Sequence, residues 1–265
     1  MTTQLMKELD QTISLLEAQI PANPRSPKNE GFAKRLQRSL ARYFSDLEKA
    51  FPYAQVERLY LKYVKEQLGS ETRDMLDPLL GAFDDTLTAE VSGHLTTIYS
   101  TGSAEMITWG KTKAGVPIAY EGPPISQAIS WAEKEGARLV TQMDTETKRR
   151  LAHTISQGIE NKRGIPGLAR DIRKDFGDMT RYRGELIART ETASALSQAS
   201  LDRMQDMGID GKEWVTVGDD RVSDECEANE GQGVIPANQA FTSGPMAPPQ
   251  HPDCRCTIAP SRLPK

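Results

Sequence analysis

The chain is poor in cysteine, histidine and aromatic residues. Its 265 residues include 3 Cys and 3 His, and only 6% are aromatic. So few cysteines exclude a small scaffold that depends on a network of disulfides. No apolar run approaches the roughly 20 residues that a membrane-spanning helix needs, and the first residues lack the basic and apolar regions of a secretion signal. We therefore expect a protein that is made in a cytoplasm and has no membrane partner.

The sequence also lacks the common catalytic motifs. It has no glycine-rich phosphate loop, no His-Glu metal motif on a helix and no nucleophile elbow. These absences argue against an enzyme, and we expect no small-molecule substrate. The competing hypothesis is a hydrolytic or nuclease site, for which the candidate residues are Glu191, Asp219, Asp220, Cys226 and His251.

The length and the charge of the chain limit the number of domains and the partners that can be expected. A chain of this length can form one large domain or two smaller ones and can bury a sizeable core. Its net charge of −4 gives no reason to expect general affinity for nucleic acid. The charge is uneven, however, because residues 145–189 hold 11 Lys and Arg against 6 Asp and Glu, whereas residues 211–265 hold 5 against 8. Solvated helix faces explain the basic segment most simply, and contact with an acidic partner or with DNA phosphates is the alternative.

Helical periodicity dominates the first 208 residues. Apolar residues recur at a spacing of three and four, which predicts an N-terminal helix or arm over residues 1–20 and helical regions over 28–111 and 125–208. Pro21, Pro24 and Pro27 follow the first helix, which is either a detachable arm or a helix docked on the body. The predicted fold class is mainly α: a multi-helix body with a small C-terminal α+β motif domain over residues 209–265.

Several polar residues indicate helix starts within these regions. Asp77 and Pro78 predict the N-cap and first turn of a helix to about Ser100, with a further short helix over 104–110. Asp144 or Thr145 predicts another start, and Thr180 predicts the cap of a long helix that ends near Met207.

The tail domain changes its period to two. Residues 214–217 alternate as a strand does, and a short helix around 223–229 carries Cys226. We expect short strands near 234–236 and 254–259, a sharp bend at Gly231 and Gly233, and a turn at Asp219, Asp220 and Arg221.

All three cysteines and one histidine lie in this tail. The spacing is Cys226, then His251, Cys254 and Cys256. In an extended segment Cys254 and Cys256 point to the same side, and thiolates with an imidazole are good ligands for a structural zinc ion. Two alternatives stay open: three free thiols packed as small hydrophobic groups, or a disulfide from Cys226 to one of the pair.

A family resemblance rests on a series of motifs. Arg189, Thr190, Glu191 and Thr192 lie on a predicted helix, and Trp214, Asp219, Asp220, Arg221 and Gly231 follow with Cys226 and the closing stretch from His251 to Cys256. Over roughly residues 125–260 the chain resembles the phage Mu F-like head morphogenesis family. One departure is Ser223, because many relatives have a second cysteine shortly before the one that matches Cys226.

The resemblance implies a structural minor head protein of a tailed phage or prophage that acts in head morphogenesis at or near the portal. Its implied partners are the portal protein and the inner capsid or scaffold, and its implied location is the virion, after synthesis in the host cytoplasm. The alternative function is a DNA-binding protein associated with the packaged or ejected genome. Arg189 and Glu191 are two positions apart, so they diverge on the helix surface, where each either braces the tail or stays solvated.

Overall fold

The computed structural model of the protein describes residues 20–63, 71–113, 115, 125–161 and 163–263. The chain divides into two compact units, each built from stretches that are far apart in sequence. Unit 1 contains the chain up to Arg35, His94–Ala132 and the chain from Leu186 onward, whereas unit 2 contains Leu36–Gly93 and Glu133–Glu185. The predicted N-terminal helix or arm lies outside the described residues, apart from Ile20.

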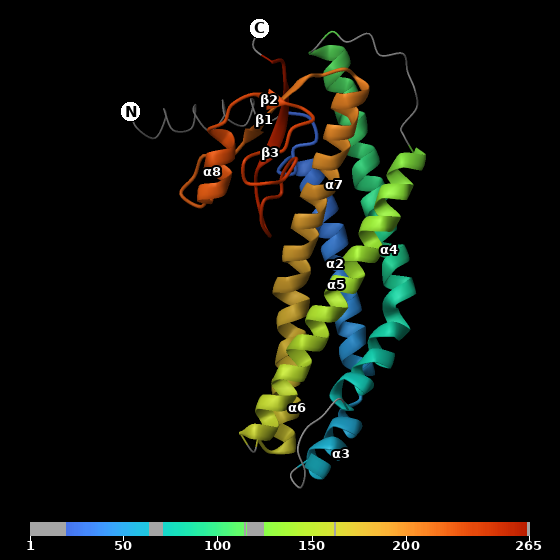
Figure 1. Ribbon diagram of the computed structural model, residues 1–265. Helices are drawn as coiled ribbons and strands as arrows, with labels where there is room; N and C mark the ends of the chain where they lie inside the picture. The colour runs from blue at the N-terminus through green and yellow to red at the C-terminus, as the bar shows by residue number, and fades with distance from the viewer. Residues whose placement is uncertain (1–19, 64–70, 114, 116–124, 162, 264–265) are drawn as a thin grey trace, which may run out of the picture. The chain divides into compact units, whose positions relative to one another are not determined.

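Helices make up most of the described chain, so the prediction of a mainly α protein with a small α+β region near the C-terminus is confirmed. Figure 1 shows them in chain order: α2 (Pro27–Ala50), α3 (Tyr53–Tyr63), α4 (Glu71–Thr112), α5 (Ile125–Glu160), α6 (Ile165–Asp178), the π-helix η1 (Met179–Arg183), α7 (Gly184–Asp206) and α8 (Asp224–Glu230).

The predicted start of a helix at Asp77 is wrong. Helix α4 already begins at Glu71, with Pro78 inside it, and it continues to Thr112 without the expected break before residue 104. Leu76 and Leu80 are both fully buried, as are Tyr99 and Met106 further along. Burial of this apolar face stabilises the whole length of the helix and outweighs the single hydrogen bond lost at Pro78.

The starts predicted at Asp144, Thr145 and Thr180 are also wrong. Residues 144 and 145 lie in the middle of α5, and Thr180 lies in η1, which joins α6 directly to α7. The Thr145 hydroxyl donates to the carbonyl of Thr141 at 2.9 Å and the Thr180 hydroxyl to that of Phe176 at 2.8 Å. A hydroxyl bonded to the preceding turn does not cap a new helix, so these side chains are compatible with continuous helix.

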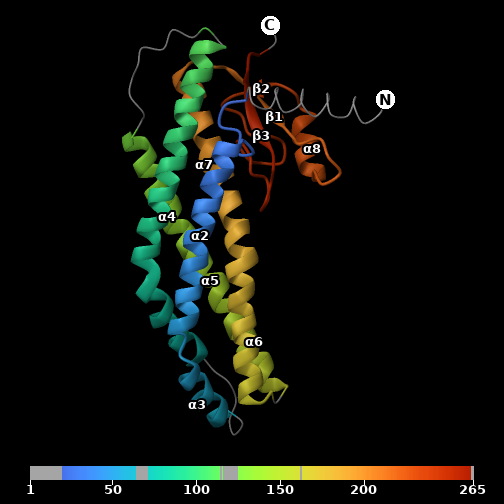
Figure 2. The same cartoon turned by 180° about the vertical axis from the view of Figure 1, so that it is seen from behind.

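Unit 2 is held by aromatic contacts and close helix approaches. The rings of Phe51 and Phe176 lie 5.5 Å apart, and the Arg173 guanidinium lies 4.8 Å from the ring centre of Tyr53, so α3 and α6 lie side by side (Figure 2). Gly136 of α5 faces Ser92 of α4 so closely that an added Cβ would lie 2.3 Å from the Ser92 hydroxyl oxygen. The absence of a side chain at Gly136 therefore allows these two helices to approach closely.

The sheet of unit 1 has three antiparallel strands in the order β2-β1-β3. They are β1 (Gly211–Val215), β2 (Ile235–Pro236) and β3 (Thr257–Ser261), so β1 begins earlier than its alternating pattern predicted and the cysteine pair precedes β3. The sharp bend needs Gly233, whose φ is +64°, whereas Gly231 has a helical φ of −62° at the end of α8.

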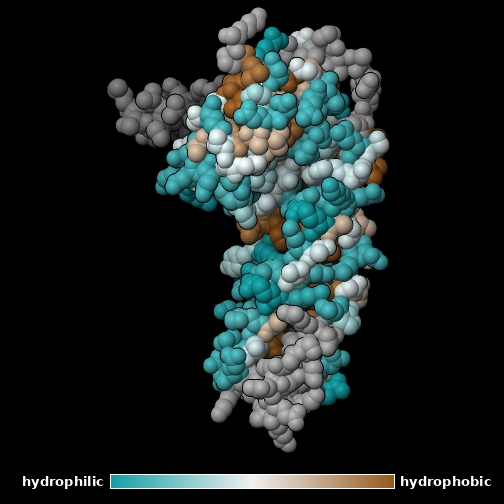
Figure 3. All heavy atoms as spheres, in the orientation of Figure 1, coloured by the Kyte–Doolittle hydropathy of each residue, from teal (hydrophilic) through white to brown (hydrophobic). Residues whose placement is uncertain are grey.

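The core of unit 1 joins this sheet to two helices. Trp214 of β1 packs edge-on against Phe241 at a ring distance of 5.0 Å, together with Met106 of α4 and Leu201 and Met204 of α7. The face shown in Figure 3 is mostly hydrophilic, with small separate apolar patches. Among the described residues, no helix combines the length and the apolar character needed to cross a membrane.

Candidate functional site

The three cysteines come together in the tail of unit 1. Cys226, Cys254 and Cys256, here called the cysteine cluster, have sulfur atoms that all lie within 4.8 Å of one another, and all three are buried. The Ser223 hydroxyl accepts from the Cys226 N–H at 3.3 Å and caps α8, which fixes the first sulfur. The Cys226 and Cys254 sulfurs are 3.7 Å apart.

A tight turn brings His251 beside this cluster. The Cys254 N–H donates to the His251 carbonyl at 3.1 Å, with Pro252 and Asp253 as the central residues. Asp253 has a φ of +58°, which a type II turn requires at that position and which Asp tolerates better than most residues. The His251 Nε2 atom consequently lies 3.7 Å from the Cys226 sulfur.

The tautomer of His251 follows from its other nitrogen. Nδ1 lies 2.9 Å from the Pro252 carbonyl oxygen, which can only accept, so Nδ1 carries the proton and donates. Nε2 of the neutral ring therefore presents its lone pair towards Cys226. Metal-binding histidines are commonly oriented in this way, with the second ring nitrogen bonded to a carbonyl.

The environment favours a thiolate at one position of the cluster. Hydrogen bonds from the Cys256 thiol and from the backbone N–H groups of Cys256 and Gln250 lower the pKa of Cys254 to about 5. The hydrogen bond to Cys254 raises the pKa of Cys256, and burial raises that of Cys226. Cys254 is therefore the sulfur of the cluster that ionises most readily, and a bound cation would favour further ionisation.

Trp214 also faces the cluster. Its indole Nε1 is buried without a hydrogen-bonding oxygen or nitrogen, and it lowers the pKa of Cys256. An N–H directed at sulfur stabilises a thiolate. The sequence marked Trp214 as a motif residue on a strand but contained no signal for this role.

Two contacts connect the turn of His251 to helix α7. Arg189 forms an ion pair with Asp253 at 3.3 Å, and the Thr190 hydroxyl accepts from the Asp253 N–H at 3.0 Å. Glu191, two positions from Arg189, is buried at 7% exposure. The predicted divergence of Arg189 and Glu191 is therefore seen in their different surroundings.

The remaining motif residues form the turn before α8. Asp219 accepts two hydrogen bonds of 2.6 Å from the Arg255 guanidinium, and these bonds lower the pKa of Asp219 to about 2. Asp219 also accepts from the Arg221 N–H at 3.1 Å, while the side chains of Asp220 and Arg221 are exposed. The group of clustered ligand atoms found among the described residues contains the three cysteines, and His251, Glu191, Asp219 and Asp220 are not part of it.

Lys212 was missed by sequence reasoning because a lysine on a short strand normally indicates a solvated face. Here it is fully buried. Its ammonium group donates to the Met246 carbonyl at 2.7 Å and lies 5.2 Å from the ring centre of Phe241. Burial lowers the pKa of Lys212 to about 8. Lys212 anchors the loop that leads to His251.

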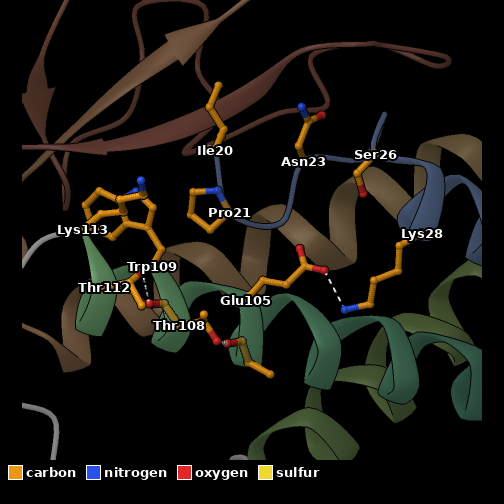
Figure 4. Close-up of a pocket in the computed structure, with 11 residues that line it drawn as sticks. Ile20, Pro21, Asn23, Ser26, Lys28, Glu105, Thr108, Trp109, Thr112 and Lys113 are labelled. Atoms are coloured by element: carbon orange, nitrogen blue, oxygen red, sulfur yellow. Dashed lines mark hydrogen bonds and ion pairs between the residues drawn. The ribbon is translucent and has the colours of Figure 1, made fainter. Parts of the chain in front are cut away.

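A separate groove of about 710 Å³ lies elsewhere in unit 1, between the segment before α2 and the end of α4 (Figure 4). Ile20 and Pro21 face Trp109 across it, and Lys28 is paired with Glu105 at 2.9 Å. Glu105 also accepts from the Ala22 N–H at 2.9 Å, so its charge already serves to hold the entry to α2. Among the described residues that line this partly apolar groove, Glu105 and Lys28 are paired with each other.

These features define a mainly helical protein whose small C-terminal α+β region gathers cysteine and histidine side chains. Residues 145–259 match the family described as Phage Mu protein F like protein, so over this region the chain is similar to that family. The resemblance that the motifs predicted is thereby confirmed, and it supports a protein of phage head morphogenesis. The comparison with curated proteins found no match. The comparison with solved structures found none either.

Proposed function

We propose that the protein is a structural minor head protein of a tailed phage or prophage, which acts in head morphogenesis at or near the portal. The observation that carries this proposal is the Mu F-like match, which includes the helices α6 and α7 and the cysteine cluster. The proposed partners are the portal protein and the inner capsid or scaffold, and the proposed location is the virion. In this role the chain is a binding component and not an enzyme.

The charge distribution supports protein partners over DNA. Arg149 and Arg150 both bond to Glu146, and Arg163 bonds to Asp171. Arginines paired in this way have less to gain from phosphate contacts than solvated ones, since each would first have to give up its carboxylate partner. Glu146 and Asp171 are already counted in the charge balance of residues 145–189, and the remaining basic excess is reduced by pairs with acids outside the segment, Lys148 with Asp77 and Arg189 with Asp253.

Co-expression with the portal protein of the same phage genome tests the proposal. We expect the two proteins to elute together in size-exclusion chromatography and to stay together at 0.5 M salt. A complex with duplex DNA whose affinity falls steeply with salt, in the absence of portal binding, would favour the DNA-binding alternative. Binding to neither portal, scaffold nor capsid protein would refute the proposed function.

We further propose that one structural zinc ion is held by Cys226, His251, Cys254 and Cys256. The ligand edges of a tetrahedral site with Zn–S and Zn–N bonds of ordinary length are about 3.8 Å between sulfurs and about 3.6 Å between sulfur and nitrogen. The separations of 3.7 Å from the Cys226 sulfur to Cys254 and to His251 fit these values. His251 lies outside the group of ligand atoms that are all within 4.8 Å of one another, so its ring would have to move towards Cys254 and Cys256 to complete the site. Such an ion would join α8 to the segment before β3 and so close the tail domain.

Elemental analysis of protein purified under reducing conditions tests this site. We expect about one zinc per chain, with loss of the metal and a lower melting temperature in the Cys254→Ser variant. His251→Ala should bind zinc more weakly, whereas His153→Ala, an exposed histidine on α5, is the matched control and should not change binding. Failure of the wild-type chain to take up added zinc would leave the thiol-packing alternative.

A further inference from the structure

Three helices of unit 2 bring two carboxyl groups together in its interior. Tyr43 of α2 donates its hydroxyl proton to Oδ1 of Asp144 on α5, at 3.2 Å. The carboxyl of Asp84 on α4 lies within hydrogen-bonding reach of that of Asp144 and raises the pKa of Asp144. Asp144 is only 7% exposed, and Oδ1 of Asp84 is buried with no protein N–H or O–H donor.

The nearby cations attract the charge of Asp144, since Lys148 lowers the pKa of Asp144 and Asp144 raises that of Arg183, but their bonds go to other groups. Arg183 of η1 donates to the Thr147 hydroxyl at 2.8 Å and to the Met143 carbonyl at 3.0 Å. Lys148 of α5 pairs with Asp77 at 2.9 Å.

Two ionised carboxylates contain only acceptors, so they cannot hydrogen-bond to each other. A single proton between them makes a hydrogen bond possible, because the protonated carboxyl becomes a donor. The buried oxygen of Asp84 can then take part in a hydrogen bond. Tyr43 cannot supply this proton, because burial and both carboxylates raise the pKa of its hydroxyl far above its usual value. It remains a donor to Asp144.

We propose that Asp84 and Asp144 share one proton and form a pH-sensitive joint between α2, α4 and α5. While the proton is present, it links α4 to α5, and Tyr43 links α2 to the same pair. When it is lost, two negative charges face each other inside unit 2 and the joint is weakened. The groups that face the joint are Tyr43, Arg183 and Lys148, from α2, η1 and α5.

The direction of the pH dependence follows from the pKa of Asp144. Burial and the neighbouring Asp84 raise it to about 7 from its usual 3.8. Between these values the folded chain binds one proton more than the unfolded chain, so its stability falls as pH rises. The unfolding equilibrium constant is expected to increase by up to about tenfold for each pH unit in this range.

The test is urea unfolding of the full chain at pH 5, 6, 7 and 8, with wild type and Asp144→Asn. Asparagine donates to Asp84 without a titrating proton, so we expect this variant to lose much of the pH dependence and to gain stability relative to wild type at pH 8. Asp85→Asn, at an exposed position next to Asp84, is the matched control and should keep the wild-type slope.

A second measurement does not depend on the variant folding. Carboxyl-carbon NMR of the wild-type protein should show Asp144 titrating with a midpoint near 7. A midpoint below 5 for Asp144 would overturn the proposal. So would an Asp144→Asn variant whose stability differs from wild type by the same factor at every pH, because that result describes a structural contact without a shared proton.

Discussion

Replacing Gly136 by alanine tests the close approach of α4 and α5 within unit 2. An alanine Cβ would lie 2.3 Å from the Ser92 hydroxyl oxygen and 3.4 Å from the Ser92 Cβ and backbone nitrogen. Two effects oppose each other. Alanine is favoured over glycine in a helix interior by about 1 kcal/mol, whereas forcing an extra carbon into a packed contact costs about 1–3 kcal/mol.

The close contact with Ser92 should outweigh the helix preference of alanine, so the substitution should lower the stability. Ser92 is 9% exposed, so its side chain has little free space into which it can move. We expect Gly136→Ala to destabilise the protein by about 1–2 kcal/mol, which lowers the melting temperature by about 2–8 °C for a chain of this size. Thermal unfolding followed by circular dichroism measures this shift.

Gly81 of α4 provides the matched control, because an added Cβ there meets no atom within 4 Å. Gly81→Ala should therefore show the helix preference alone and raise the stability by about 0.5–1 kcal/mol. The Ser92→Ala background removes the oxygen at 2.3 Å and should reduce the cost of Gly136→Ala. The reasoning is refuted if Gly136→Ala stabilises the protein as much as Gly81→Ala.

Three further predictions concern polar groups of unit 1. The pKa of Lys212 is lowered to about 8 from 10.5, so the unfolded chain binds more protons than the folded chain between these values. The free energy of unfolding should therefore rise by up to about 3 kcal/mol between pH 8 and 10.5. Urea titrations should show this rise in wild type and not in Lys212→Met. Glu105→Gln should weaken the bond from the Ala22 N–H and lower the stability by about 1–2 kcal/mol, and an unchanged urea midpoint would contradict this role. The pKa of Asp219, about 2 beside Arg255, should return towards its usual value in Arg255→Ala, as NMR titration of the carboxyl carbon can show.

The sequence predicted the helical class because apolar residues in long helices repeat regardless of where each helix ends. It also placed the short helix of Cys226, since Ser223 is a local cap whose hydroxyl needs only the next turn. The wrong helix starts have a common cause. Asp144 is polar because it meets Tyr43 and Asp84 from other helices, and Thr145 and Thr180 bond to their own preceding turns. None of these circumstances is visible in a local pattern.

In the candidate site, too, the local features were predicted from the sequence and the contacts between distant segments were not. Spacing alone paired Cys254 with Cys256, and the His-Pro-Asp-Cys order is that of a tight turn. In contrast, the buried Lys212, the indole N–H of Trp214 and the ion pair of Arg189 with Asp253 depend on contacts between distant segments. Such contacts are set by the tertiary packing, which one sequence without its structure does not show.

The discontinuous build of unit 1 has a consequence for synthesis on the ribosome. Met106 and Trp109 of α4 are made early, but residues that cover them, including Trp214, Phe241 and Ile258, emerge up to about 150 residues later. Unit 1 therefore cannot complete its core during most of translation, and a chain interrupted before β3 would leave an apolar surface exposed. Only a chain translated through residue 258 can bury that surface. Chaperones and proteases that bind exposed apolar surface would therefore recognise incomplete chains before any assembly step.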